Sequence, residues 1–170
     1  SDDWYEPNMC QVMFDTIEKQ KTDLVMCRTY CEVDSTLSRK EYKMRQLSLK
    51  YVNPRQHGKY KLTSKNISDI NVMLWNKIWR HDLVKQYNIR FPDGHEHDDD
   101  AFWYMYAFVA NDIFFLRKKL YHYVMRSGSI MSAQYNNVPK NKNDILFVSD
   151  YVLDFLFQNK LLQQYKETFI

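Results

Sequence analysis

Cysteine, glycine and proline are all scarce in this chain. Its 170 residues include three cysteines, three glycines and four prolines. Cys10, Cys27 and Cys31 are odd in number and form no C-x-x-C pair, which argues against a disulfide framework or a zinc site and predicts a reducing compartment. With few glycines and prolines and 45% hydrophobic residues, the composition excludes a disordered chain. We therefore expect one compact folded domain.

Long apolar runs and a large excess of one charge are also missing. No stretch approaches the roughly 20 apolar residues that span a bilayer, and the first residues lack the layout of a signal peptide. The net charge is only +3, which gives weak support for a nucleic-acid surface. These absences predict a cytoplasmic protein with no nucleic-acid partner, and they restrict any membrane contact to a peripheral one.

Hydrophobic periodicity predicts a mixture of helices and strands in the first half. Residues 7–20 have helical spacing, and residues 23–33 form an apolar, β-branched run of strand length. Residues 34–61 show no sustained period and are expected to be irregular. Residues 70–88 begin like a strand and continue as a short helix, and a brief strand and turn are predicted in "IRFPDG", 89–94.

The second half is predicted to contain two helical regions separated by a hairpin. A helix is expected from Asp98, because apolar residues recur there at three and four. The run "DIFFLRKKLYHYVMR", 112–126, predicts two short strands around a basic turn. Residues 142–168 again have a helical pattern. The order of elements indicates an α/β or α+β fold rather than a bundle or a sandwich.

An acidic cluster opens the central helix. The stretch "DGHEHDDDAFWYMYAF", 93–108, begins with two histidines and five carboxylates in eight positions. Acids at a helix start are common caps. Two other interpretations stay open: a metal cage built from His95, His97 and the aspartates, and a carboxylate base for a hydroxyl. On the residues alone we favour the cap.

Four segments together resemble a known family. They are "SDDWYEPNM" (1–9), "LWNKIWRHDLVKQYNIRFPDG" (74–94), "HDDDAF" (97–102) and "LYHYVMRSGSIM" (120–131). In this order and at this spacing, the chain resembles the second half of a family 2 glycosyltransferase with the GT-A fold. Such enzymes build bacterial capsule, lipopolysaccharide or other surface glycans. The resemblance covers almost the whole chain.

The resemblance implies a particular architecture. It implies the C-terminal part of a GT-A mixed sheet flanked by helices, with a β-hairpin and C-terminal helices. One acceptor-side domain is expected over 1–170, with the sheet in 1–140 and the last helices in 141–170. The chain would begin inside the family's DxD motif, so the N-terminal nucleotide-binding half is expected to be absent.

The implied activity is an inverting transfer of a sugar from a nucleotide-sugar donor to an acceptor hydroxyl. A carboxylate takes the proton of that hydroxyl. The glutamate–aspartate pair of the family falls on Asp98 and Asp99, which implies that Asp99 is the base. If Asp99 begins a helix, the amide dipoles are expected to favour its charged form. Whether this chain is active by itself is left open.

The resemblance also implies a metal ligand and several substrate contacts. In such enzymes a divalent cation, Mn²⁺ or Mg²⁺, binds the donor diphosphate, and Asp2 falls on the second carboxylate of DxD. A frayed acidic terminus is the alternative for Asp2. Substrate-binding roles are implied for five further residues: Trp75, Lys77, His122, Arg126 and Ser129.

Structural alternatives exist for each of these substrate contacts. A tryptophan in an apolar run such as Trp75 is more typical of a core. Lys77 and Arg80 share a face only in a helix, and in a strand they point apart. Solvated positions at a strand end are the alternative for His122, Arg126 and Ser129.

The C-terminal helices carry more apolar surface than one buried face needs, including Phe147, Phe155, Phe157, Leu161 and Leu162. This excess predicts contact with a second copy, with the missing half, or with the periphery of the inner membrane, where a lipid-linked acceptor would lie. The expected partners are a nucleotide-sugar donor and a glycan or lipid-linked acceptor. Two other functions stay open: a non-catalytic carbohydrate-binding or assembly module, and a single-stranded nucleic-acid binder.

Overall fold

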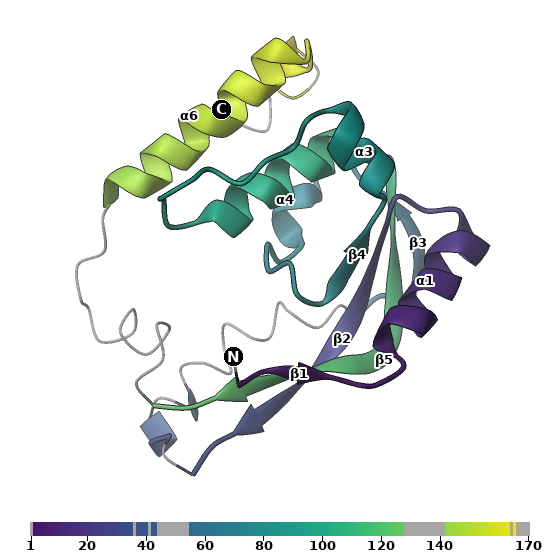
Figure 1. The fold of residues 1–170 in the computed structure, drawn as a ribbon, viewed down its shortest axis with the longest axis vertical. Coiled ribbons are helices and arrows are strands. Elements are labelled where there is room, and N and C mark those ends of the chain that lie inside the picture. Colours follow the sequence, from purple (N-terminus) through teal and green to yellow (C-terminus); the bar gives the residue numbers. More distant parts are fainter. Residues whose placement is uncertain are drawn as a thin grey trace.

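A computed structural model describes residues 2–35, 37–40, 42–43, 55–127, 142–163 and 165. Figure 1 shows its helices and strands along the chain. They are β1 (Trp4–Tyr5), α1 (Met9–Gln20), β2 (Leu24–Val33), β3 (Gly58–Lys61), the 3-10 helix η1 (Ile67–Asp69), β4 (Lys77–Trp79), α3 (His81–Gln86), α4 (Asp98–Val109), β5 (Asp112–Met125) and α6 (Lys142–Gln158).

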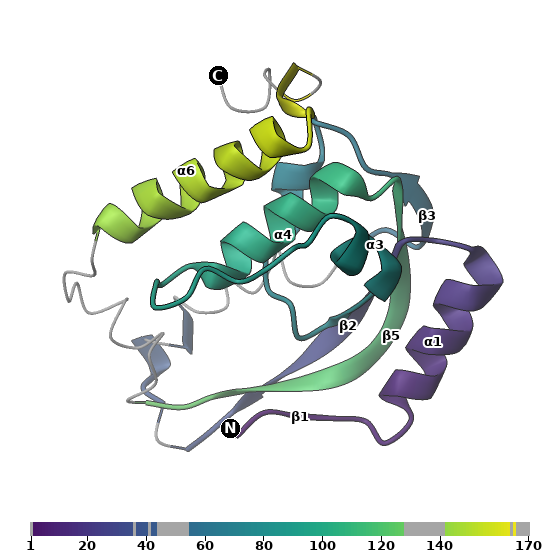
Figure 2. The same ribbon diagram turned by 45° about the horizontal axis from the view of Figure 1, so that its top comes forward.

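A mixed sheet forms the centre of the molecule. Its strand order is β1-β5-β2-β4, and β3 also pairs with β5. The two long strands β2 and β5 run parallel, whereas β1, β3 and β4 are all antiparallel to their neighbours. Figure 2 shows that β5 curls strongly along its length. The predicted α/β fold, a mixed sheet flanked by helices, is therefore confirmed.

Helices cover the two faces of the sheet unequally. Helix α1 packs on one face, where Met13 and Ile17 join an apolar cluster with Val25 and Phe114. Helix α4 packs on the other face, and α6 lies beyond α4 (Figures 1 and 2). Because α4 is enclosed by the sheet and by α6, most of its residues after Asp100 are buried. Within the described residues, no helix has both the length and the apolar character to span a bilayer.

The predicted hairpin in 112–126 is wrong, because these residues form one continuous strand, β5. The basic residues that suggested a turn lie where the pairing with β2 shifts register. Leu116 pairs with Cys27, but the next pair joins Lys119 to Arg28. The extra residues are accommodated as a bulge-like irregularity, which keeps their charged side chains exposed while the strand continues on both sides.

Most other predicted elements are confirmed. The helices predicted in 7–20, from Asp98 and from 142 correspond to α1, α4 and α6, and the strand predicted in 23–33 is β2. Residues 70–88 contain the predicted strand and helix as β4 and α3, after a loop. The strand predicted in 89–94 is absent, although a turn is present at 93–94. Strand β1 was not predicted, since two residues give no periodic signal. The prediction that 34–61 are irregular is wrong at its end, because 58–61 form strand β3, which pairs with β5.

Candidate active site

The acidic cluster lies in the first turn of α4. His97 precedes the helix in the left-handed conformation, with φ 66°. Asp98 Oδ1 accepts a hydrogen bond from the Asp99 amide (2.9 Å), and Asp99 Oδ1 accepts one from the Asp100 amide (3.1 Å). The aspartates therefore satisfy amide groups that the helix leaves unpaired at its start, although His97, the residue before the helix, makes no side-chain capping bond.

Asp99 is also a half-buried acid with an altered affinity for protons. Burial raises the pKa of the Asp99 carboxyl, and the negative charges of Asp100 and Asp98 raise it further, against opposing backbone hydrogen bonds. The expectation that helix dipoles would dominate and favour the charged form is therefore wrong. Desolvation outweighs them, because the carboxyl is only partly in contact with water. Once ionised, such a carboxylate is a stronger base than an exposed aspartate.

Lys77 lies buried close to the start of α4. Its ammonium group donates hydrogen bonds to the carbonyl oxygen of Asn71 (2.8 Å), to the carbonyl oxygen of Met73 and to Asn76 Oδ1 (3.1 Å). It also lies 5.4 Å from the ring centroid of Trp103. All three hydrogens of the ammonium are thus used within the protein. In this arrangement Lys77 holds the loop 71–76 in place, and its role as a substrate contact stays a prediction.

Burial lowers the pKa of Lys77 to about 7, while the Cys27 thiol and the Asp99 carboxyl act in the opposite direction. Lys77 and Asp99 are therefore electrostatically coupled. Arg80, three residues later, lies on the other face of the sheet. There it forms an ion pair with Glu18 (2.7 Å) and donates to the carbonyl oxygen of Thr22 (3.2 Å). Lys77 and Arg80 point apart, as residues at this spacing do around a strand.

Trp75 lies on the sheet, between the aspartates near the N-terminus and the acidic first turn of α4. Its ring stacks on Tyr121, with centroids 4.4 Å apart, and on Tyr123, with centroids 5.6 Å apart. The Tyr121 hydroxyl donates to Asp3 Oδ2 (3.0 Å), and Asp3 Oδ1 accepts from the Val124 amide (2.9 Å). Trp75 is half-buried, so it is a packed ring rather than a free platform.

These contacts form a continuous path across the candidate site. The path runs from Asp3 through Tyr121 and Trp75 into the loop 71–76, and from that loop through Lys77 to the surroundings of Asp99. Asp3 and the two tyrosines were not predicted as site residues from the sequence. The alternation Y-H-Y in 121–123 was the available signal, because it places both tyrosines on one face of a strand.

Asp2 is engaged in an ion pair. Its carboxylate accepts a hydrogen bond from Arg126, which lowers the pKa of Asp2. Within the part of the chain that the structure describes, no three His, Cys, Asp or Glu side chains are grouped to hold a metal ion. The residues present therefore do not fit a metal by themselves, and Asp2 as a cation ligand stays a prediction. Arg126 as a substrate contact also stays a prediction.

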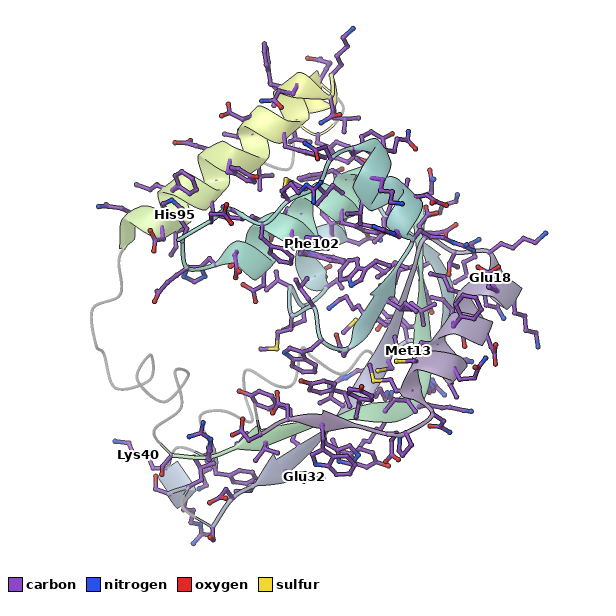
Figure 3. The ribbon with its side chains drawn as sticks, viewed as in Figure 1. Met13, Glu18, Glu32, Lys40, His95 and Phe102 are labelled. Carbon is purple, nitrogen blue, oxygen red and sulfur yellow. The ribbon has the colours of Figure 1, made fainter. Side chains whose placement is uncertain are left out.

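The two histidines of the acidic cluster have separate partners. His95 Nδ1 lies 3.2 Å from Asp144 Oδ1 at the start of α6 (Figure 3), and His97 Nδ1 lies 2.9 Å from Asp100 Oδ2. The His95 ring also stacks on Phe147. The histidines thus diverge, and the metal-cage interpretation gains no support.

His122 lies away from this path. Its ring is stacked between Trp4 and Tyr30, with centroid distances of 3.4 and 4.4 Å, and its two nitrogens contact Glu32 (2.5 Å) and Glu6 (3.0 Å). Because side chains alternate along β5, His122 faces the side opposite its tyrosine neighbours. The side chain is buried and both ring nitrogens have partners, and a substrate role for His122 stays a prediction. Ser129 lies outside the described residues.

Comparison with known proteins shows what the chain is similar to. No protein-family model matches it. It is 28% identical over 176 residues to EpsH of Bacillus subtilis, which is named as a glycosyltransferase; the match covers 100% of this chain and 48% of EpsH. It is 25% identical over 142 residues to the glycosyltransferase GlyG of Streptococcus pneumoniae, covering 80% of this chain and 45% of GlyG. The chain thus spans about half the length of these relatives.

Comparison with solved structures shows a shared fold. The chain superimposes on Staphylococcus aureus TarS 1-349 in complex with UDP-GlcNAc with a TM-score of 0.64 at 17% identity, covering 99% of this chain and 45% of TarS. The complex with UDP gives a TM-score of 0.61 at 15% identity, with coverage of 99% and 44%. The chain is therefore similar in sequence to glycosyltransferases, and it shares its fold with part of a protein that binds UDP-GlcNAc.

Proposed function

We propose that this chain is the acceptor-side part of an inverting glycosyltransferase of family 2 with the GT-A fold. The observation that carries the proposal is the similarity to EpsH over the whole length of the chain. The fold shared with the UDP-GlcNAc complex of TarS supports a nucleotide-sugar donor. The acceptor is a bacterial surface glycan of the capsule or lipopolysaccharide type, free or linked to lipid.

Asp99 is the catalytic base in this proposal. An acceptor hydroxyl transfers its proton to the Asp99 carboxylate as its oxygen forms a bond to the anomeric carbon of the donor. The bond from that carbon to the phosphate oxygen breaks, and the nucleoside diphosphate leaves with the electron pair. The half-buried position of Asp99 supports the role, because a desolvated carboxylate takes up a proton more readily than an exposed one.

The neighbours of Asp99 position the reacting groups. Lys77 fixes the loop that carries Trp75 on the sheet, and Asp98 accepts the amide hydrogen of Asp99. In this proposal the nucleotide is bound by residues outside this chain, which spans about half the length of its relatives. A divalent cation, Mn²⁺ or Mg²⁺, on the donor diphosphate, with Asp2 as one ligand, belongs to the proposal, but no chemical step is assigned to it.

Replacement of Asp99 tests the proposal most directly. The protein that contains this chain is assayed for transfer from nucleotide sugars, beginning with UDP-GlcNAc, in the presence of Mn²⁺. Asp99→Asn is expected to lower kcat by about 10²- to 10⁴-fold, the usual contribution of a general base. Asp93→Asn is the matched control, because it makes the same chemical change in the exposed turn before α4 and should keep full activity.

Two results would contradict the proposal. Equal rates for the wild type and Asp99→Asn would remove Asp99 as the base. Absence of transfer and of donor hydrolysis with every nucleotide sugar, combined with tight binding of oligosaccharides, would instead favour the non-catalytic carbohydrate-binding module.

A further inference from the structure

A cavity of about 390 Å³ lies between α4 and α6. Figure 2 shows α6 beside α4, on the side of α4 that faces away from most of the sheet. The volume falls in the range of about 300–1,000 Å³ that is typical of small-molecule sites. Asp100 lines the cavity, whereas Asp99, one position earlier on α4, does not. The cavity is thus adjacent to the proposed base but distinct from it.

The wall that α4 supplies changes from polar to apolar along the helix. His97, Asp100, Tyr104 and Phe108 line the cavity and follow one another at three and four residues. From Asp100 to Phe108 the helix rises about 12 Å. The polar end therefore lies beside Asp99, and the apolar end lies deeper between the helices.

The wall that α6 supplies is mainly apolar. Ile145, Val148 and Val152 line the cavity, and the two valines are almost completely buried. Ile145 is 55% exposed and lies at the rim. An aliphatic wall of this kind favours a hydrocarbon group over a group that needs hydrogen bonds.

Two polar groups at the cavity have unused hydrogen-bonding capacity among the described residues. Asp100 uses Oδ2 for His97, which leaves Oδ1 without a partner. The Tyr104 side chain contacts the Phe108 ring, but its hydroxyl makes no hydrogen bond. A carboxylate oxygen and a phenol in this position can bind hydroxyl groups as acceptor and donor.

We propose that this cavity binds the apolar aglycone of the acceptor, with hydroxyls of the attached sugar at Asp100 and Tyr104. The ligand class is a glycoside with an aliphatic or aromatic aglycone. The inference rests on the proposed function, because it places the acceptor sugar beside Asp99. The order of polar and apolar groups along α4 matches the order of sugar and aglycone in such a molecule.

The first experiment measures binding of two glycosides by calorimetry, without any donor. Hexyl β-D-glucopyranoside is expected to bind at least about tenfold more tightly than methyl β-D-glucopyranoside, because five additional carbons enter apolar surroundings. Equal affinities, or no binding of the hexyl compound, would overturn the inference.

A pair of variants then locates the site. Ile145→Trp fills the rim of the cavity from an exposed position and is expected to abolish the preference for the hexyl compound. Leu146→Trp is the matched control, because Leu146 is 67% exposed and does not line the cavity. Equal binding by both variants would place the aglycone elsewhere and overturn the inference.

Activity separates this inference from the proposed function. If transfer activity depends on Asp99 but Ile145→Trp does not raise the KM of the hexyl acceptor relative to the methyl acceptor, the function stands and the cavity inference fails. If the hexyl compound binds at Ile145 but the protein transfers no sugar, the proposed function fails and the cavity is a glycoside-binding site without the proposed catalytic role.

Discussion

Asp99 and Lys77 are two residues near the candidate site whose pKa values the structure shifts. Each is desolvated, and desolvation disfavours the charged form of any group. It therefore raises the pKa of the acid and lowers the pKa of the base. Both effects depend on how far the side chain is buried, and each leads to a measurable dependence on pH.

For Asp99 the prediction concerns the acid side of the activity profile. A base acts only when it is ionised, so the rate should fall as pH decreases through the raised pKa of Asp99. Because the charge of Asp100 contributes to that raised pKa, Asp100→Asn should move the acid limb of kcat to lower pH. Rate profiles of the two proteins test this, and an unchanged or upward-shifted limb would contradict it.

For Lys77 the prediction concerns stability. Between about pH 7 and the ordinary value of 10.5, the folded state holds fewer protons on Lys77 than the unfolded state does. The free energy of unfolding should therefore rise with pH in this window, by up to about 1.4 kcal/mol per pH unit from this group. Lys77→Met should remove this part of the slope.

Urea unfolding of both proteins at several pH values in that window measures the difference. Lys77→Arg is a useful comparison, because arginine stays charged and cannot release its proton. It should be the least stable of the three proteins throughout the window. The same pH slope in wild type and Lys77→Met would contradict the prediction.

At the scale of elements, Tyr106 joins α4 to two strands. The Tyr106 hydroxyl donates to the carbonyl oxygen of Asp23, just before β2 (2.6 Å), and accepts from the amide of Arg80, just after β4 (2.9 Å). Burial raises the pKa of this phenol. This side chain thus adds polar contacts to the apolar packing that holds α4, and its acidic first turn, against the sheet.

Loss of this hydroxyl should therefore be costly. Tyr106→Phe removes the hydrogen bonds of the hydroxyl, while the Arg80 amide keeps its bond to the Asp23 carbonyl (3.0 Å), so the free energy of unfolding is expected to fall by about 0.5–1.5 kcal/mol. Tyr104→Phe on the same helix is the control, because its hydroxyl makes no hydrogen bond among the described residues. Thermal or urea unfolding compares them, and equal stabilities would show that Tyr106 does not join these elements.

Element β5 shows where sequence patterns are ambiguous. The charges of Arg117 to Lys119 predicted a turn, because charged residues between apolar runs are typical of turns. The same residues fit a bulge in a continuous strand. Only the neighbours of β5 distinguish the two: β2 pairs with β5 on both sides of the irregularity, and β1 and β3 pair with its two ends.

At the scale of the whole molecule, the sheet separates two apolar clusters. Met13 on α1 belongs to one cluster, and Leu156 on α6 belongs to the other. Both side chains are at most 1% exposed. Since β2 and β5 contribute residues to both clusters, we expect the two sides to unfold together.

This expectation is tested with one substitution on each side. Met13→Ala and Leu156→Ala should each lower the free energy of unfolding by about 2–5 kcal/mol. In each variant, tryptophan fluorescence and far-ultraviolet circular dichroism should report the same single transition. Separate transitions for the two probes would show that α6 or α1 unfolds by itself, and would contradict a single domain over 1–170.

The α6 surface also concerns the whole molecule. The predicted excess of apolar surface is present at Phe147, Phe157 and Leu162, which are 38%, 74% and 37% exposed, whereas Phe155 is buried. Contact of this surface with a second copy, with a nucleotide-binding half or with a membrane stays a prediction, because an exposed apolar stripe does not identify its partner.

The sequence by itself determined the major helices and the long strand β2, because their periodicity reflects which face is buried. It also determined that α4 begins at a run of acidic residues, because the residue types and the spacing of the apolar residues are enough to predict that start. The tertiary structure decided which of these residues have water, a partner or a cavity beside them. Lys77 is occupied by loop carbonyls, His122 is enclosed on the opposite face, and the cavity at Asp100 exists only because α6 packs beside α4. These outcomes depend on contacts between residues far apart in the chain, which local patterns do not contain.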